Sequence, residues 1–161
     1  MNSSRNSLLS LSLLLPLTLA AEAETAVINP AITVAVVRFA PAKPFDDKQI
    51  VELNNTCVDA LKVRHADVAS RACTAALMRA KSYSSGGSFQ LYGVGLFALE
   101  PEAFAATYSN AALMHWQAGD RAKAEKYLQR AAAIAPQASF VVRNRAAFSQ
   151  LAAKSLVTAI N

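Results

Sequence analysis

Few residues in this chain have side chains that could do chemistry. Its 161 residues include two cysteines, Cys57 and Cys73, and two histidines, His65 and His115. Two histidines are too few for a multi-histidine metal centre, and two cysteines are too few for a four-cysteine zinc module. A catalytic cysteine would need signature residues beside it as well as a histidine partner, and neither cysteine has such neighbours. We therefore expect a protein that is not an enzyme and that has no catalytic residue, no metal and no cofactor.

A glycine motif at residues 93–98 is the other candidate for a ligand site. It reads Gly-Val-Gly-Leu-Phe-Ala, which fits the Gly-x-Gly-x-x-Ala pattern of dinucleotide-binding loops. That pattern binds a dinucleotide only within a strand–helix–strand unit, and no such unit is predicted around it. We interpret the motif as part of an apolar loop that packs against helices.

Residues 1–23 have the three-part layout of a secretory signal peptide. Arg5 precedes an apolar run from Leu8 to Leu19, and Ala21-Glu22-Ala23 is an A-x-A cleavage pattern. The run is short for a bilayer span, so an N-terminal membrane anchor is the less favoured alternative. We expect an exported protein, periplasmic or secreted, with no transmembrane segment in the mature chain. In an oxidising compartment the two cysteines are candidates for a disulfide, and two reduced core thiols are the alternative.

Residues 24–45 form a separate segment after the predicted cleavage site. They contain three prolines and the β-branched run AITVAVVRF at 31–39. Such a run favours a strand, but a lone strand in a helical protein has no sheet to join. We therefore expect an extended arm packed on the surface, with a disordered arm as the alternative. Its apolar side chains favour an arm that covers exposed helix faces: Ile32, Val34, Val36 and Phe39.

Residues 46–161 have helical spacing, so we expect an all-α domain there. The composition is 53% hydrophobic and 17% charged, which excludes a disordered chain. Apolar residues recur every three or four positions. The Ser- and Gly-rich stretch 82–88 interrupts this pattern, and Pro101 begins a new helix. Gly119-Asp120 separates that helix from the next, which Pro136 ends.

The residues at 105–138 follow a recognisable repeat pattern. An early aromatic, an Asn two positions on, a Gly-Asp turn, a small–large–small triplet and a closing proline stand in register: Tyr108, Asn110, Gly119-Asp120, Ala124, Leu128, Ala131 and Pro136. On these residues the stretch resembles a tetratricopeptide repeat, a helix–turn–helix unit of about 34 residues.

A weaker copy lies upstream, over about 50–81. Its matching positions are Leu53, Asn55, Cys57, Ala69, Cys73 and Ala76, and Arg64-His65 replaces the Gly-Asp turn. An ordinary helical hairpin is the alternative for this copy. Residues 82–102 would be an insertion. Residues 139–159 repeat only a first helix, with Asn144 at the Asn position, and resemble the cap helix that such arrays need.

The resemblance implies antiparallel helix hairpins whose concave groove binds a protein or peptide partner. In this frame the groove is lined by Ser109, Leu113, Trp116 and Gln117, with Arg143 at its edge. Trp116 packed beneath the loop at 82–99 is the alternative. The frame also places Cys57 and Cys73 on facing sides of the first hairpin, as a disulfide requires. The expected function is therefore that of an exported, non-catalytic interaction module.

The positive charge lies in the C-terminal half. Residues 105–161 carry seven basic and two acidic residues, which accounts for the net charge of +5. The alternative function is therefore an envelope-associated structural protein that docks on an anionic polymer or membrane surface. We expect no nucleic-acid partner for an exported protein. One clear repeat, one weak repeat and a cap fall short of the three or so units that a solenoid needs, so a homodimer is possible.

Overall fold

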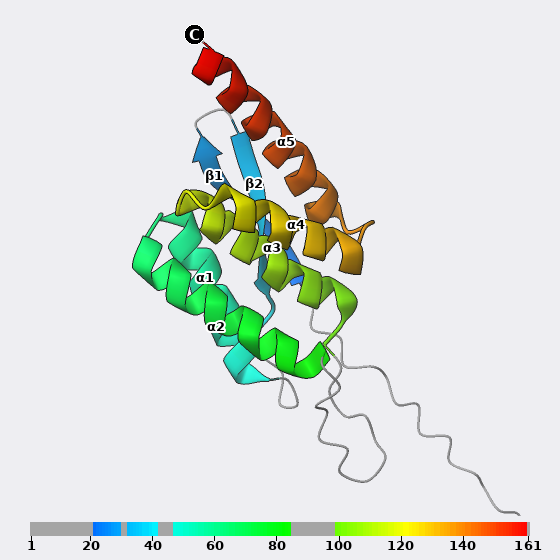
Figure 1. Cartoon of the computed structure of the whole chain (residues 1–161). Coiled ribbons are helices and arrows are strands. Elements are labelled where there is room, and N and C mark those ends of the chain that lie inside the picture. Colours follow the sequence, from blue (N-terminus) through cyan, green and yellow to red (C-terminus); the bar gives the residue numbers. More distant parts are fainter. Residues whose placement is uncertain (1–20, 30–31, 42–46, 85–98, 161) are drawn as a thin grey trace, which may run out of the picture.

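The computed structural model describes residues 21–29, 32–41, 47–84 and 99–160. These residues form an N-terminal β-hairpin followed by five helices (Figure 1). The strands are β1 (Ala21–Asn29) and β2 (Ile32–Phe39). The helices are α1 (Lys48–Lys62), α2 (Ala66–Ser84), α3 (Pro101–Gln117), α4 (Arg121–Ile134) and α5 (Ser139–Ile160). The glycine motif at 93–98 and most of the predicted signal segment lie outside the described residues.

The expectation of a mostly helical chain is confirmed, but an all-α fold is wrong in one respect. Residues 32–39 are a true strand, because residues 21–29 supply the antiparallel partner that a lone strand would lack. Alanines and glutamates fill the first half of β1, so the β-propensity of that half is low. Predicted cleavage after Ala23 would shorten β1 by three residues.

Several helix ends coincide with residues that cap a helix or form a turn. Asp47 caps α1 by accepting hydrogen bonds from the backbone N–H groups of Gln49 and Ile50. Asp120 caps α4 in the same way through Lys123. Gly119 follows α3 and has a φ of +83°, a left-handed conformation that ends the helix and that glycine adopts at little energetic cost. Arg64 has a φ of 57° in the α1–α2 turn, which glycine would adopt at lower cost.

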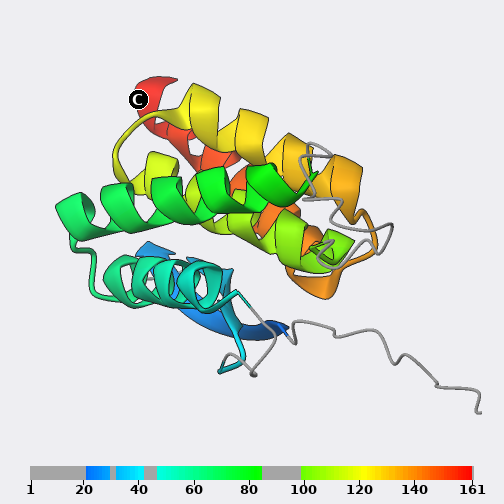
Figure 2. The same cartoon turned by 90° about the horizontal axis from the view of Figure 1, so that it is seen from below.

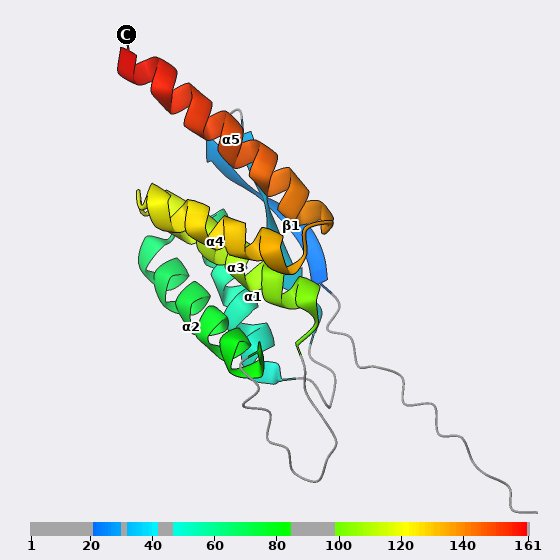
Figure 3. The ribbon, with the colours of Figure 1, turned by 45° about the vertical axis from the view of Figure 1, so that its right-hand side comes forward.

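Helices α1 and α2 form one antiparallel hairpin, and α3 and α4 form a second that packs beside it (Figure 2). They cover the ranges of the weaker and the clearer predicted repeat, and α5 covers the range of the predicted cap helix. The β-hairpin lies against the other side of the helices, where β2 contacts α1, α3 and α5 (Figures 1 and 3). The prediction that the arm covers exposed helix faces is therefore confirmed for residues 32–39.

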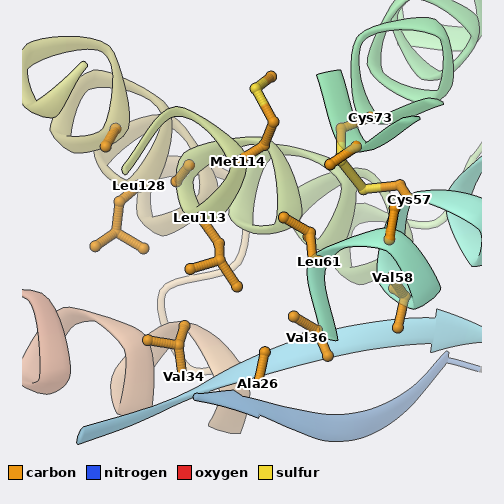
Figure 4. Close-up of a cluster of buried hydrophobic side chains, with 14 of the residues drawn as sticks. Ala26, Val34, Val36, Cys57, Val58, Leu61, Cys73, Leu113, Met114 and Leu128 are labelled. Carbon is orange, nitrogen blue, oxygen red and sulfur yellow. A yellow bond between two sulfur atoms is a disulfide. The ribbon is translucent and has the colours of Figure 1, made fainter. Parts of the chain in front are cut away.

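Both faces of β2 are buried. Val34 and Val36 join a cluster with Val58, Leu61 and Leu113, part of which Figure 4 shows. The other face of the strand contributes to a second cluster, with side chains from α1, α3 and α5: Ala35, Val37 and Phe39. A strand buried on both faces is a central part of the core and not a surface arm.

The disulfide predicted from the sequence is present. Cys57 of α1 is bonded to Cys73 of α2, with their Cα atoms 4.7 Å apart. Both residues are buried beside Leu61 and Val58 (Figure 4). The bond therefore joins the two helices of the first hairpin from inside the core.

Among the described residues, no helix combines the length and the apolar character that crossing a bilayer would require.

Candidate peptide-binding groove

Three buried asparagines define the surface that faces β2. Asn54 lies on α1, Asn110 on α3 and Asn144 on α5, and each side chain is at most 1% exposed. A buried amide group is costly unless its N–H and C=O groups are hydrogen-bonded. These three amides bond to the backbone of β2 and to each other or to Ser109, so they hold β2 against the face formed by α1, α3 and α5.

Val37 is held at the centre of this site. Its N–H donates to Oδ1 of Asn110 at 2.9 Å, and its C=O accepts from Nδ2 of the same asparagine at 2.9 Å. Nδ2 of Asn54 donates to the same carbonyl at 2.8 Å. Asn110 also donates to Oδ1 of Asn54 at 3.0 Å, which fixes both side chains. Both backbone groups of Val37 are thus bonded to side chains from two helices, α1 and α3.

The same arrangement recurs two residues away on each side. The N–H of Ala35 donates to Oδ1 of Asn144 at 2.7 Å, and Nδ2 of Asn144 donates to the carbonyl of Ala35 at 2.8 Å. Ser109 accepts from Nδ2 of Asn144 at 2.7 Å. At the other end, Asn55 forms the corresponding pair of bonds with Phe39, at 2.8 and 2.9 Å.

The spacing of these bonds follows from strand geometry. Successive residues of a strand direct their backbone N–H and C=O groups to opposite edges. Residues 35, 37 and 39 therefore present one edge of β2 to the asparagines. The intervening residues present the other edge to β1, in the register that pairs Val36 with Glu24 and Val34 with Ala26. Asparagine side chains take the place of a neighbouring strand on the helix side of β2.

Ionic contacts hold β1 at the rim of the groove. Glu24 accepts from Lys62 of α1 at 2.7 Å and from Arg38 of β2 at 3.1 Å. The hydrogen bond from Lys62 is the main reason that the pKa of Glu24 is lowered, although partial burial acts in the opposite direction. Arg38 also pairs with Asp59. Arg64 donates to the carbonyls of Val27 and Ile28, so the α1–α2 turn grips the end of β1.

Two of the five predicted groove residues lie beneath β2. Ser109 is buried and bonded to Asn144, and Leu113 is fully buried against the valines of the strand. Gln117 lies at the end of α3 and donates to the carbonyl of Leu61 at 3.2 Å. Arg143 is exposed on α5 and has no contact with the strand among the described interactions.

Trp116 is half-buried between α3 and α5. Its ring meets Phe148 edge-on, with centroids 4.9 Å apart, and the Arg121 guanidinium lies 5.2 Å from its centroid. Since Trp116 packs between helices, it lies apart from the asparagines that contact β2. Its predicted alternative position, beneath the loop at 82–99, involves residues that are mostly outside the described part of the chain.

The other residues with chemical potential have structural surroundings. His115 is half-buried and packs at a tilt against Tyr127, with ring centroids 5.1 Å apart. Burial lowers the pKa of His115, although the nearby Asp120 acts in the opposite direction. His65 is exposed in the α1–α2 turn. Within the described ranges, no group of three or more His, Cys, Asp or Glu side chains is placed to hold a metal ion.

Sequence reasoning did not assign the asparagines to the site. Asn110, Asn144 and Asn55 were recognisable only as matches to a repeat position. A physical signal was nonetheless present, because Asn54, Asn110 and Asn144 stand among apolar residues on the inner faces of their helices. A polar residue on an apolar helix face requires a buried partner, and the backbone of an extended segment supplies it.

Comparisons with protein-family models, with curated proteins and with solved structures give no significant match.

Proposed function

We propose that this protein is a non-catalytic interaction module, similar to tetratricopeptide-repeat proteins and exported from the cell. Its α1, α3 and α5 face would bind an extended segment of a protein partner. The observation that carries this proposal is the set of asparagine bonds to both backbone groups of Ala35, Val37 and Phe39. Side-chain amides that bond to both backbone groups of every second residue match the spacing of an extended chain.

The strand now in the groove indicates which segments would fit. Backbone bonds give affinity without selecting a sequence, whereas the buried side chains select for size. The positions equivalent to Ala35, Val37 and Phe39 face one apolar cluster, and those equivalent to Val34 and Val36 face the other. A fitting partner would therefore present apolar residues at the positions equivalent to 34–37 and 39, with a small residue at 35, an aromatic at 39 and a polar residue tolerated at 38.

Such a segment would have to replace β2, because β2 fills the site. Displacement is favoured where the partner forms the same backbone bonds and the hairpin is weakened or withdrawn. The rim contacts of Glu24 and Arg64 oppose withdrawal, since they hold β1 and β1 holds β2.

The direct test uses a variant in which the asparagines cannot bind β2. Val37→Pro removes the N–H that donates a hydrogen bond to Oδ1 of Asn110, and it introduces a ring that a paired strand does not accommodate. A labelled peptide with the sequence of residues 31–40 should bind this variant and raise its melting temperature. It should bind the unaltered chain at least about tenfold more weakly, because β2 competes for the site.

The matched control removes the asparagine from the same background. Val37→Pro combined with Asn110→Ala should no longer bind the peptide. Equal binding with and without Asn110, or no binding to the Val37→Pro variant at any concentration, would contradict the proposed site.

A further inference from the structure

The first three residues of β1 lie between two candidate sites for removal of the export signal. The A-x-A pattern at 21–23 lies within the strand, so a cut after Ala23 would remove these three residues from β1. Thr18-Leu19-Ala20 has small side chains at the same two positions and ends immediately before the strand. A cut after Ala20 would therefore leave the whole of β1 in the exported chain.

Residues 21–23 belong to the paired part of the β-hairpin. They supply three of its eight aligned pairs, in which Ala21 stands opposite Phe39, Glu22 opposite Arg38 and Ala23 opposite Val37. The backbone N–H and C=O of Arg38 are directed at β1, because those of its two neighbours bind asparagines on the other edge. A chain that began at Glu24 would leave these groups of Arg38 without a strand partner.

A chain end at Glu24 would also add a positive charge beside two cations. The carboxylate of Glu24 accepts from Nζ of Lys62 at 2.7 Å and from Nε of Arg38 at 3.1 Å. A cut after Ala23 would place an α-ammonium group on the same residue as this carboxylate. The new group would repel both cations and compete with them for the carboxylate.

The surroundings of Ala21 have the opposite charge. Ala21 lines a pocket of about 560 Å³ at the start of α3, together with Glu100 and Glu102. Of the described residues that line this pocket, these two are acidic and none is basic. Neither carboxylate forms an ion pair within the described part of the chain, and that of Glu100 makes no capping bond to α3. A positive chain end at Ala21 would therefore find two carboxylates without a cation.

We infer that the export signal is removed between Ala20 and Ala21, and that the new α-ammonium group of Ala21 pairs with Glu100 and Glu102. The inference rests on the export that is part of the proposed function. The step is a hydrolysis by a peptidase of the secretory pathway. Water adds across the peptide bond between the two alanines, leaving a carboxylate on Ala20 and an ammonium group on Ala21.

Intact-mass analysis of the exported protein tests the position of the cut. The full chain is expressed in a bacterium, and the protein recovered from the periplasm or the medium should begin at Ala21. Ala20→Leu should abolish this product, because it removes the small side chain at the cut. Ala23→Leu is the matched control and should leave the product unchanged, since Ala23 is exposed on β1 and lies beyond the cut.

The outcomes separate the cut from export itself. An exported protein that begins at Glu24 would overturn the inference and leave export in place. A protein that retains Met1, or that is absent from both the periplasm and the medium, would contradict the inference and the proposed export together.

The charge argument is tested on purified chains that begin at Ala21 or at Glu24, each freed from a removable N-terminal tag. The chain from Ala21 should melt at least about 4 °C higher, because it keeps three strand pairs and gains an ion pair. Acetylation of the α-amino group removes its charge and should lower the melting temperature of the Ala21 chain but not that of the Glu24 chain. Equal melting temperatures of the two chains, or an Ala21 chain that acetylation does not destabilise, would overturn the inference.

Discussion

The buried asparagines show how single residues convert a helical surface into a site for an extended chain. Asn55, Asn110 and Asn144 each accept from the N–H and donate to the C=O of one residue of β2, which is how a neighbouring strand would pair. Within the described residues, no buried side-chain nitrogen or oxygen lacks a hydrogen-bond partner. The price of a polar group in the core is therefore offset only while an extended strand is present.

Asn110 should matter more to stability than Asn55, although both bind the strand. Asn110→Ala leaves the buried N–H of Val37 without an acceptor, and it removes the bond to Asn54. We expect a loss of about 2–4 kcal/mol in the free energy of unfolding. Asn55 is half-buried, so water can replace its bonds, and Asn55→Ala should cost about 1 kcal/mol. Urea unfolding of both variants checks this order, and equal losses would contradict it.

Arg64 combines a strained backbone with a useful side chain. Its φ of 57° costs about 1 kcal/mol relative to glycine, while its guanidinium holds two carbonyls of β1. Arg64→Ala should destabilise the protein by about 1 kcal/mol, because it loses the bonds and keeps the strain. Arg64→Gly should lie near the unaltered protein, since relief of strain offsets the lost bonds. A glycine variant less stable than the alanine variant in urea unfolding would refute this account.

At the scale of elements, the helices were predictable and the hairpin was not. Asp47, Pro101 and Gly119 mark helix ends by local chemistry, so their effects are visible in sequence. The run from Ile32 to Phe39 also has a local signal for an extended segment. Its pairing depends on β1 and on asparagines 16 to 109 residues away, which no local pattern reveals.

The first helical hairpin should depend strongly on its disulfide. The bond joins Cys57 and Cys73, which are 16 positions apart in the sequence, and restricts the unfolded chain. In the chain-entropy description the double variant Cys57→Ala/Cys73→Ala should lose about 3 kcal/mol. Calorimetry of this variant against the oxidised protein measures the loss. Peptide mapping without reductant supplies the control, and two freely alkylated thiols in the native protein would contradict the bond.

Acid should weaken the contact between the start of α1 and the end of α2. Burial acts to raise the pKa of Asp47, but hydrogen bonds from Tyr83, Arg79 and the N–H of Ile50 outweigh it, so the pKa falls below its usual 3.8. Burial and the same Asp47 raise the pKa of Tyr83 to about 12, so this phenol stays protonated as a donor. A carboxyl group with a lowered pKa in the fold stabilises it above its unfolded pKa and loses that effect as pH falls.

The free energy of unfolding should therefore decline below about pH 4, and Asp47→Asn should make that decline shallower. Urea unfolding at several values between pH 3 and 7 measures both curves. A variant whose stability falls as steeply with acid as that of the unaltered chain would show that Asp47 does not contribute to the decline.

At the scale of the whole molecule, the β-hairpin covers helix faces that would otherwise be exposed, and the sequence partly predicted this cover. Two hairpins and a last helix leave the apolar faces of α1, α3 and α5 exposed, so an additional segment had to cover them. The apolar arm could be predicted as that cover from Val34, Val36 and Phe39. The position of this segment against α1, α3 and α5 could not be predicted, because these three helices come together only in the folded protein.

The central claim is that the groove recognises the backbone of an extended segment through asparagine side chains, and peptide N-methylation tests it most directly. In a labelled peptide of residues 31–40, methylation at Val37 removes the N–H that donates to Asn110. Methylation at Val36 removes an N–H that points to the opposite edge, which is free in a separate peptide. Fluorescence anisotropy with the Val37→Pro chain should show binding of the unmodified and Val36-methylated peptides, and at least about tenfold weaker binding after methylation at Val37. Equal binding of both methylated peptides would contradict backbone recognition by the asparagines.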